Sequence, residues 1–323
     1  MRRTRTPALV LTLAFVPAFL LAGCEEPAPE EPEGEVVPGT ELPETGEPEA
    51  FLPQLFDGDG EARRIALAPD NDELFVQYRP GPDSEPSLHT SRWDPETETW
   101  SPLEPATIVE EGEEDLSPFV SHDGQYLLFS SRRGHEEAQI ADESIWTTRW
   151  DPAEEDWMEP WPLPAVNTVS WDGAPSLAAN ANLYFSSFRE GPAAGRDIYM
   201  APFVDASWEL PEPLQGEVNT SSDEVDPWIS LEEEFILFAS DREGQLDLYV
   251  SYRDDATGEW SEAEPLEALN TEADEHSPTL SPREEFLFFN RDNEILWLPI
   301  EESGIDLGEE EPAADQEAPA GAQ

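Results

Sequence analysis

The chain has 323 residues and a formal net charge of -58 at pH 7, from 74 acidic and 16 basic residues, and every basic residue is arginine. A surface with so few cations cannot displace the counterions of a nucleic acid, so nucleic acids are excluded as partners. Electrostatic adhesion to an anionic membrane surface is excluded for the same reason.

The first segment of the chain is typical of an exported protein. Basic residues within positions 1–5 precede an apolar run at residues 7–21, which is too short to span a membrane as a helix. Small residues follow this run. We therefore expect residues 1–23 to be a signal peptide that is removed on export.

Cys24 is the only cysteine of the chain, and it follows Leu21, Ala22 and Gly23. This motif resembles the bacterial lipobox, and the resemblance implies cleavage before Cys24 and attachment of acyl chains to it. Glu25 comes next, which by resemblance to other Gram-negative lipoproteins favours the outer membrane, on its periplasmic or surface side. An ordinary signal peptide with a chance cysteine is the alternative. A single cysteine also excludes a disulfide within the chain.

Two segments have the composition of disordered chain. Residues 24–50 contain ten Glu, six Pro and no basic residue, so they can bury too little apolar surface to offset the cost of ordering. We expect them to form an extended tether. Residues 303–323 are also acidic and rich in Ala, Gln and Pro, and we expect a disordered tail there.

Residues 51–302 contain five copies of one pattern: acidic residues, a Pro, an apolar run that ends in Phe, and then an Arg. The anchors lie 53, 57, 52 and 51 residues apart, a period typical of one supersecondary unit per repeat. The anchors are Ile65, in the Pro position of the first copy, and Pro118, Pro175, Pro227 and Pro278. Phe and Arg are four residues apart in four copies and two apart in the last: Phe75/Arg79, Phe129/Arg133, Phe185/Arg189, Phe238/Arg242 and Phe289/Arg291.

Each copy contains four short apolar or aromatic segments separated by turn residues, and no window keeps a helical period. The first segment follows the anchor, the second ends in Phe, and the third contains Ile or Leu beside Tyr or Trp. The fourth is expected around a tryptophan that is followed by Pro, at Trp100, Trp157, Trp208 and Trp260. These features predict an all-β fold, a five-bladed β-propeller of four-stranded blades.

The fifth copy has only three of the four segments, because no tryptophan-proline segment follows Trp297. Residues 51–56 lie at the right distance before the first copy to supply the missing strand. We expect them to pair into the last blade and close the ring, since that blade would otherwise have an unpaired edge.

The repeat has the form Pro-x-x-Ser-x-Asp-Gly-x-x-Leu-x-Phe-x-Ser-x-Arg-x-Gly and is most complete at residues 118–134 and 227–250. It resembles the WD40-like (PD40) propeller repeats of the TolB family, over residues 51–300. The resemblance implies a propeller fold and says little of function, because propellers serve many functions. The family's propellers have six blades and this chain has five copies, so the family's partner contacts are not carried over.

An acidic residue stands before each anchor: Glu61, Asp115, Asp172, Glu224 and Glu275. If the first strand of each blade lines the axis, these carboxylates would form a ring that could hold a cation or a polar ligand. The alternative is that each caps a turn or pairs with the repeat Arg of a neighbouring blade. We favour the alternative, because a residue present in every blade is usually part of the blade. The repeat arginines are expected to be structural: Arg79, Arg133, Arg189, Arg242 and Arg291.

Other motifs for a cofactor or for catalysis are weak. Residues 57–61, Asp-Gly-Asp-Gly-Glu, resemble part of a calcium loop but lack its third acid and its distal Glu, so calcium is only an alternative there. No other metal or cofactor is expected, because the histidines lack metal-ligand spacing and are assigned to surfaces or turns. They are His89, His122, His135 and His276. The sequence contains no nucleophile elbow, zincin or phosphate-loop motif.

Two functions from different classes follow. The favoured one is a lipid-anchored, non-catalytic propeller of the cell envelope that binds or scaffolds a protein or cell-wall partner. The alternative is a glycoside hydrolase or carbohydrate-binding protein, since five-bladed propellers also carry such enzymes, which need two carboxylates. The interior acids here are repeated instead of unique to one blade, which favours binding.

The net charge of -58 indicates a salt-rich habitat, because salt screens the repulsion between the acidic residues. A dedicated acidic function is the alternative.

Overall fold

The computed structural model describes residues 37–43, 46–56, 60–110, 112–134, 143–190 and 195–307. The signal peptide, Cys24, His135 and residues 57–59 of the calcium-loop motif lie outside the described residues. Within the described ranges, no helix is long and apolar enough to cross a membrane.

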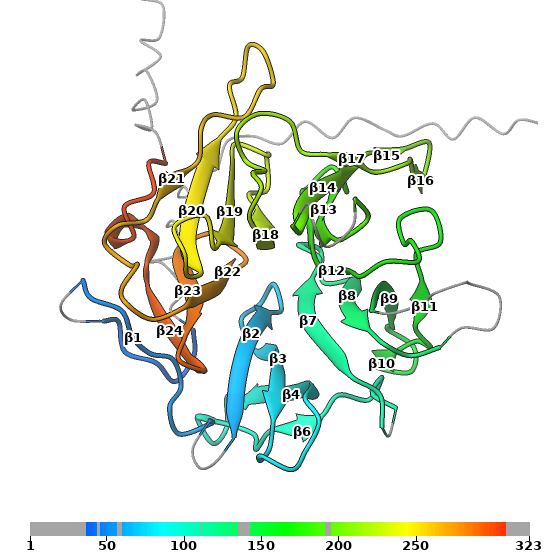
Figure 1. Ribbon diagram of the computed structural model, residues 1–323. Coiled ribbons are helices and arrows are strands. Elements are labelled where there is room, and N and C mark those ends of the chain that lie inside the picture. The colour runs from blue at the N-terminus through cyan, green and yellow to red at the C-terminus, as the bar shows by residue number, and fades with distance from the viewer. Residues whose placement is uncertain are drawn as a thin grey trace, which may run out of the picture. The chain divides into compact units, whose positions relative to one another are not determined.

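Five antiparallel sheets stand around a common axis and form a five-bladed β-propeller, which confirms the predicted fold class (Figure 1). The inner strands are β2 (Glu61–Leu67), β7 (Asp115–Val120), β12 (Asp172–Leu177), β18 (Glu224–Ile229) and β22 (Glu275–Leu280). The second strands are β3 (Glu73–Arg79), β8 (Tyr126–Ser131), β13 (Leu183–Ser187), β19 (Phe235–Ser240) and β23 (Phe286–Arg291). The third strands are β4 (Ser87–Asp94), β9 (Ser144–Asp151), β14 (Asp197–Ala201), β20 (Asp247–Tyr252) and β24 (Glu294–Pro299).

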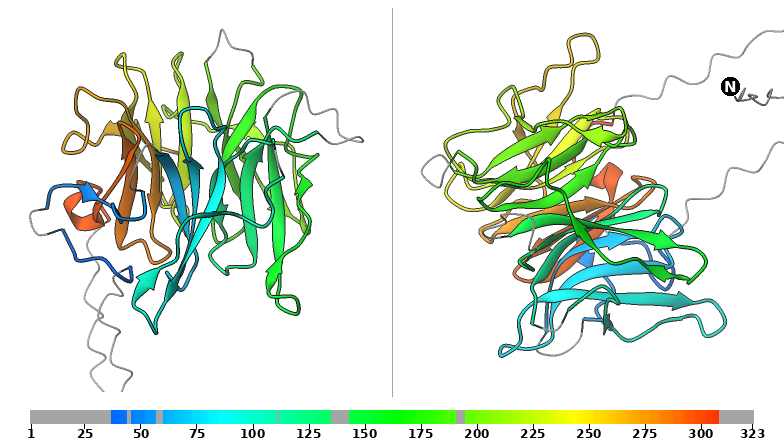
Figure 2. Two further views of the ribbon diagram at one scale, coloured as in Figure 1. Left: turned by 90° about the horizontal axis from the view of Figure 1, so that it is seen from below. Right: turned by 90° about the vertical axis from the view of Figure 1, so that its right-hand side faces the viewer.

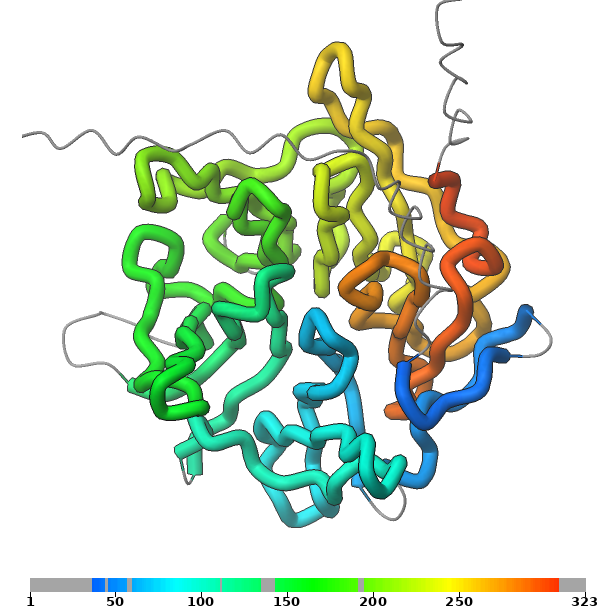
Figure 3. The backbone as a smooth tube through the Cα atoms, turned by 180° about the vertical axis from the view of Figure 1, so that it is seen from behind, coloured from blue at the N-terminus to red at the C-terminus, as the bar shows by residue number. Residues whose placement is uncertain are grey.

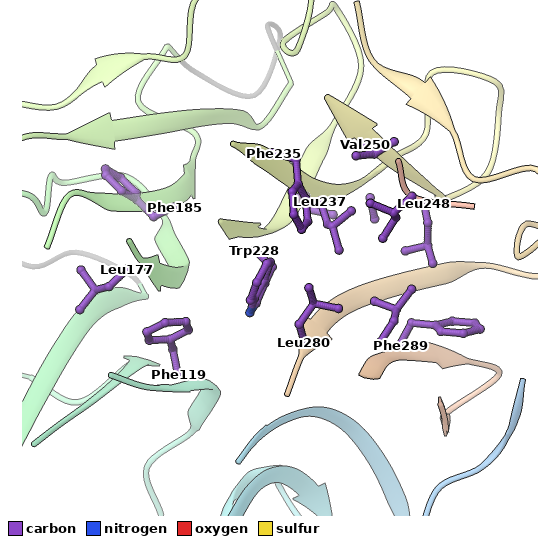
Figure 4. Packing of buried hydrophobic residues seen from close by; sticks show 14 of the residues in the cluster. Phe119, Leu177, Phe185, Trp228, Phe235, Leu237, Leu248, Val250, Leu280 and Phe289 are labelled. Atoms are coloured by element: carbon purple, nitrogen blue, oxygen red, sulfur yellow. The ribbon is translucent and has the colours of Figure 1, made fainter. Parts of the chain in front are cut away.

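The hydrophobic core lies between neighbouring blades. Strands β13 and β19 are buried at every residue, because the adjacent blades cover both of their faces. One cluster joins the second to fifth blades around the axis, and Figure 4 shows its side chains meeting between the sheets. The side views show the strands standing through the thickness of the disc, with loops at both faces (Figure 2).

The outermost strand of each blade differs in detail from the prediction. In the first four blades it has only two residues and ends in Pro: β6 (Glu104–Pro105), β11 (Trp161–Pro162), β17 (Glu212–Pro213) and β21 (Glu264–Pro265). The predicted tryptophans instead face the end of the third strand, in β5 (Thr99–Trp100), β10 (Asp156–Trp157) and β16 (Ser207–Trp208), which pairs with β15 (Phe203–Val204). Trp260 makes an isolated bridge to Arg253. Pro cannot donate to a ladder, so it is confined to such an edge.

Strand β1 (Glu49–Ala50) pairs with β24 of the last blade, which confirms that the N-terminal segment closes the ring (Figure 3). The prediction that residues 51–56 form this strand was wrong, because they form turns and the strand lies just before them. Only the Phe51 amide continues the ladder, donating to the Ile295 carbonyl at 2.8 Å. The Phe51 ring packs on Phe288, and Leu52 has a left-handed φ of 42°, so the chain turns there.

The folded unit also extends beyond residues 51–302. Val37 is fully buried, and the Trp100 indole donates to the Pro38 carbonyl at 2.8 Å. Ile305 is buried near the other end, and the Asp306 amide donates to the Tyr252 hydroxyl. The expected disorder is therefore wrong for residues 37–43, 46–50 and 303–307, because their few apolar side chains reach the propeller.

Each inner strand has a β-bulge after its second residue, and this shared bulge shows which residues of the first copy match those of the other copies. The register shifts between Ala62 and Ile65 in β2, as it does between Leu116 and Phe119 in β7. Ile65 therefore matches Phe119, and Arg64 occupies the position of the anchor prolines. The assignment of Ile65 to that position was wrong by one residue. The anchor lies 10 residues before the Phe in the third copy and 11 residues before it in the second, fourth and fifth, so repeat spacing alone admits either Ile65 or Arg64.

Candidate functional site

A cavity of about 360 Å³ lies on the axis where the inner strands begin. Four inner strands contribute to its lining, through Arg63 of β2, Leu116 and Ser117 of β7, Val225 and Asp226 of β18, and His276 and Ser277 of β22. Side chains from outside the inner strands complete the lining: Gln77, Glu143, Trp171, Arg196 and Leu246. The cavity is thus a polar site built from all five blades or the connections between them.

The repeat carboxylates do not line this cavity. Four of them are fully buried and bind the repeat Arg of their own blade, in the pairs Asp115/Arg133, Asp172/Arg189, Glu224/Arg242 and Glu275/Arg291. In the third blade, for example, Asp172 accepts from Arg189 Nη2 at 2.8 Å and from the Thr168 amide at 2.6 Å. Their oxygens are therefore unavailable to a ligand on the axis. Asp172, Glu224 and Glu275 each cap the preceding turn, as the alternative held. The arginine of each of the four pairs comes from the same blade and not from a neighbour.

The arginine of each pair also joins the aromatic packing inside the blade. The Arg189 guanidinium lies 4.4 Å from the Tyr199 ring centroid and donates to the Val166 carbonyl of the preceding connection. Arg242 lies 4.6 Å from the Tyr249 ring centroid and binds the Val218 carbonyl. The repeat arginines are thus structural, linking a strand, a ring and a connection.

The first blade departs from this arrangement. Glu61 and Arg79 form an ion pair at 3.1 Å, but their side chains are 37% and 34% exposed. Where the other blades have proline, the first has Arg64, whose side chain is 1% exposed. The two arginines at positions 63 and 64 are the sequence signal that this blade differs.

Arg64 reaches across the axis to the opposite side of the ring. Its Nη2 donates to the Pro227 carbonyl at 3.1 Å and to the Pro175 carbonyl at 3.5 Å, and its Nη1 lies 3.7 Å from Asp226 Oδ1. The prolines belong to the third and fourth blades, which Figure 1 shows opposite the first. Burial lowers the pKa of Arg64, and the charge of Asp226 opposes this shift. The guanidinium therefore closes the axial channel.

Further along the axis, the channel is filled by apolar side chains. Trp228 is fully buried and projects between the inner strands (Figure 4). Beyond it, only about 20 Å³ remains between residues such as Phe119, His122 and Leu280, which is room for about one water. The axial cavity is therefore blind.

Three polar residues of the cavity wall are linked between the fourth and fifth blades. Ser277 Oγ donates to Asp226 Oδ2 at 2.9 Å, and His276 Nδ1 lies 2.9 Å from the same hydroxyl. Burial lowers the pKa of His276; the charge of Asp226 opposes this shift, and the charge of Arg63 adds to it. Because Ser277 donates its only hydroxyl proton to Asp226, its oxygen can accept a hydrogen bond from His276.

The remaining charged groups of the wall differ in how they are paired. Arg196 binds Asp223 at 2.6 Å, and its guanidinium lies 5.6 Å from the Trp171 ring. Glu143 is nearly buried and lies 3.6 Å from Arg132. Arg63 is exposed to the cavity, and within the ranges that the structure describes no carboxylate lies within 4.0 Å of it.

The histidines are less exposed than predicted. His89 is buried against Tyr78, and His122 lies 3.1 Å from the Leu177 carbonyl; burial lowers the pKa of both. Their assignment to the surface was wrong for His89, because strand β4 carries it into the blade. Among the residues that the structure describes, no three His, Cys, Asp or Glu side chains form a group that could hold a metal ion.

No family model matches this sequence, and a search of curated proteins finds no match either. Among solved structures, a thermostable family-43 glycoside hydrolase is 9% identical and has a TM-score of 0.53, covering 75% of this chain and 89% of its own. A putative TolB from Agrobacterium tumefaciens is 14% identical, with a TM-score of 0.47 over 71% of this chain and 69% of its own. A gluconolactonase from Xanthomonas campestris is 12% identical, with a TM-score of 0.45 over 81% and 97%.

At these identities the similarity concerns the fold alone. The glycoside hydrolase is an enzyme by its description, but a shared fold does not assign an activity. The chain is a five-bladed β-propeller, and its function has to be argued from the axial cavity.

Proposed function

We propose that the chain is a lipid-anchored, non-catalytic binding module of the bacterial cell envelope, and that its ligand site is the axial cavity. The observation that carries this proposal is the contrast between repeated and unrepeated residues. The repeated charges are used inside the blades, whereas Arg63, Asp226 and His276 each occur in one blade and meet at the cavity. A concave, largely preformed cavity with convergent polar groups is typical of a ligand site.

The alternative is a glycoside hydrolase, and it is kept because two carboxylates, Glu143 and Asp226, line the cavity. Such an enzyme needs one carboxyl group that donates a proton and one that acts as a nucleophile or base. Asp226 already accepts from Ser277 and faces Arg64, and Glu143 faces Arg132. These engagements favour binding over hydrolysis.

Binding and hydrolysis are separated by one experiment on the purified mature chain. Soluble cell-wall fragments are titrated calorimetrically, and the release of reducing ends is followed in parallel. We expect heat of binding without hydrolysis. Leu116→Trp, which enlarges a side chain of the cavity wall, should abolish the heat, and Leu210→Trp, at a side chain that is 80% exposed, should not. Release of reducing ends that is lost in Leu116→Trp would favour the hydrolase.

Membrane attachment is proposed from the motif at Cys24. Stable anchoring takes more than one acyl chain. Cys24→Ser should therefore accumulate as unprocessed precursor or appear in the soluble fraction, as measured by fractionation and mass spectrometry of the N-terminus. A Cys24→Ser protein that is matured and membrane-bound like the wild type would contradict the anchor.

Adaptation to salt is proposed from the net charge of -58. Added salt shortens the screening length and removes repulsion between exposed carboxylates. We expect the Tm of the propeller to rise by many degrees between about 0.05 M and about 2 M NaCl. A constant Tm over this range would contradict the salt-rich habitat.

A further inference from the structure

The axial cavity differs in charge from the molecule around it. The chain carries 74 acidic and 16 basic residues, so an anion that approaches it is repelled in general. At the cavity, by contrast, the charges of Arg63 and Arg196 in the wall offset those of Glu143 and Asp226, and Arg64 lies beneath Asp226. The cavity is therefore a place where an anion can be held on this molecule.

Arg63 is the group in the wall with capacity for a ligand. Most arginines of the propeller are paired with a carboxylate, but Arg63 has none within 4.0 Å in the described ranges, and it is exposed. Its charge acts on the cavity, because it lowers the pKa of His276 on the neighbouring inner strand β22. A guanidinium presents two parallel N–H donors, which match the two oxygens of a carboxylate.

A second, independent observation concerns Arg64. Its Nε and Nη1 are buried and have no hydrogen-bond partner within the described part of the chain, although its side chain is only 1% exposed. The nearest carboxylate oxygen, on Asp226, lies 3.7 Å away. Its charge is thus incompletely balanced beneath the cavity, where water does not screen it, and it favours a negative group above.

The size and polarity of the wall limit the ligand further. A volume of about 360 Å³ is at the lower end for ligand pockets, which hold roughly 300–1,000 Å³. The hydroxyl, amide and carboxylate groups of Ser117, Gln77 and Asp226 can exchange hydrogen bonds with ligand hydroxyls. Asp226 and Glu143 would repel a dianion such as phosphate, so a single negative charge fits best.

We propose that the axial cavity binds a small hydroxylated monocarboxylate, a sugar acid, whose carboxylate is held by Arg63 and whose hydroxyls face Gln77, Ser117 and Asp226. This inference rests on the proposed binding function and names the class of its ligand. No bond is made or broken in the complex.

The test uses the mature chain and three probes, D-glucuronate, D-glucose and inorganic phosphate, in isothermal titration calorimetry. Glucuronate should bind at least tenfold more tightly than glucose, which has the same ring without the charge, and than phosphate. Arg63→Gln should weaken glucuronate binding at least tenfold and leave glucose unchanged. Arg149→Gln removes the same charge from an exposed arginine outside the cavity wall and should have no such effect.

Several outcomes would overturn the ligand class while leaving a binding function in place. Equal affinity for glucose and glucuronate, or an Arg63→Gln variant that binds glucuronate like the wild type, would show that the charge is not recognised. Phosphate binding as tight as glucuronate binding would show that the site recognises only the negative charge. No detectable binding of glucuronate would also overturn the proposal. Release of the fluorophore from 4-methylumbelliferyl glucuronide, lost in Arg63→Gln, would instead support the ligand class and overturn the non-catalytic function.

Discussion

The first blade and the four blades that follow it use the same two charged positions differently. In the second to fifth blades, the carboxylate at the start of the inner strand is fully buried against the repeat arginine. In the first blade, the corresponding pair of Glu61 and Arg79 is more than one-third exposed on both sides. The buried charge of the first blade lies three residues further along, at Arg64, and is directed to the axis.

This difference separates residues that build blades from residues that can build a site. The charged side chains repeated in the second to fifth blades are used in the same way in each, as the four buried ion pairs show. A side chain that breaks the repeat has no such use, and Arg63 and Arg64 break it at adjacent positions. Binding capacity in this propeller is therefore expected where the repeat is interrupted.

The largest expected effect is the loss of a buried pair. Asp172→Ala leaves Arg189 without its carboxylate and removes the acceptor of Thr168, so it should lower the free energy of unfolding by about 3–5 kcal/mol. Glu61→Ala breaks the exposed pair of the first blade and should cost less than about 1 kcal/mol. Urea unfolding of both variants measures the difference, and similar losses would remove the distinction between the blades.

An intermediate effect is expected from Arg64→Met. The carbonyls of Pro175 and Pro227 lose their donor, but the cost of burying a cation is also relieved, so the net loss should be about 1–3 kcal/mol. Arg92→Met, which breaks an exposed pair with Glu73, is the matched control and should cost under about 1 kcal/mol. An Arg64→Met variant more stable than the wild type would show that the bonds across the axis do not stabilise the ring.

The smallest effect concerns Asp197, the first residue of the third strand β14. Burial raises the pKa of its carboxyl group to about 6, and the charges of Glu224, Glu190 and Asp223 add to this shift. A carboxyl group whose pKa is raised on folding stabilises the fold below its unfolded pKa of about 4, and this contribution is lost as the pH rises through about 6. Asp197→Asn should therefore raise the stability at about pH 8, by about 1 kcal/mol after solvent screening, and leave it unchanged near pH 3.

The control for this effect is Asp247→Asn, at the same position of the next blade. Burial also raises the pKa of Asp247, but a hydrogen bond from Gln245 opposes the shift. The gain in stability at high pH should therefore be smaller for Asp247→Asn than for Asp197→Asn. Melting curves at the two pH values measure both variants, and a gain for Asp197→Asn that is equal at low and high pH would rule out a titration effect.

The blades could be predicted from the sequence because their parts are local. The constant spacing between Phe129 and Arg133, or between Phe185 and Arg189, reflects one strand and the turn after it, and this register is preserved in the fold. Closure of the ring could be predicted as well, since the last copy lacked a strand and the first residues of the domain were unused. The exact strand could not, because Pro53 and a left-handed Leu52 turn the chain just where the hydrophobic run suggested extension.

The axial cavity could not be predicted, because it depends on contacts between blades. Asp226 and Ser277 lie 51 residues apart and meet only when the fourth and fifth inner strands stand side by side. Arg64 reaches the Pro227 carbonyl over 163 residues. Repeat spacing alone admitted either Ile65 or Arg64 at the anchor position, and the strand pairing of β2 identifies Arg64. Adjacent arginines in an acidic chain were the available signal.

The contacts of the N-terminal segment also determine where a pulling force would act on the propeller. Val37 and Pro38 rest against the first blade through Trp100, and β1 pairs with β24 of the fifth, so the segment crosses the seam between the first and last blades. A force applied at the N-terminal end therefore acts first on the contact of Val37 and Pro38 with the first blade, and then on the pairing of β1 with β24 in the fifth. Pulling between residues 37 and 307 would measure the force needed to separate β1 from β24 and so to open the ring.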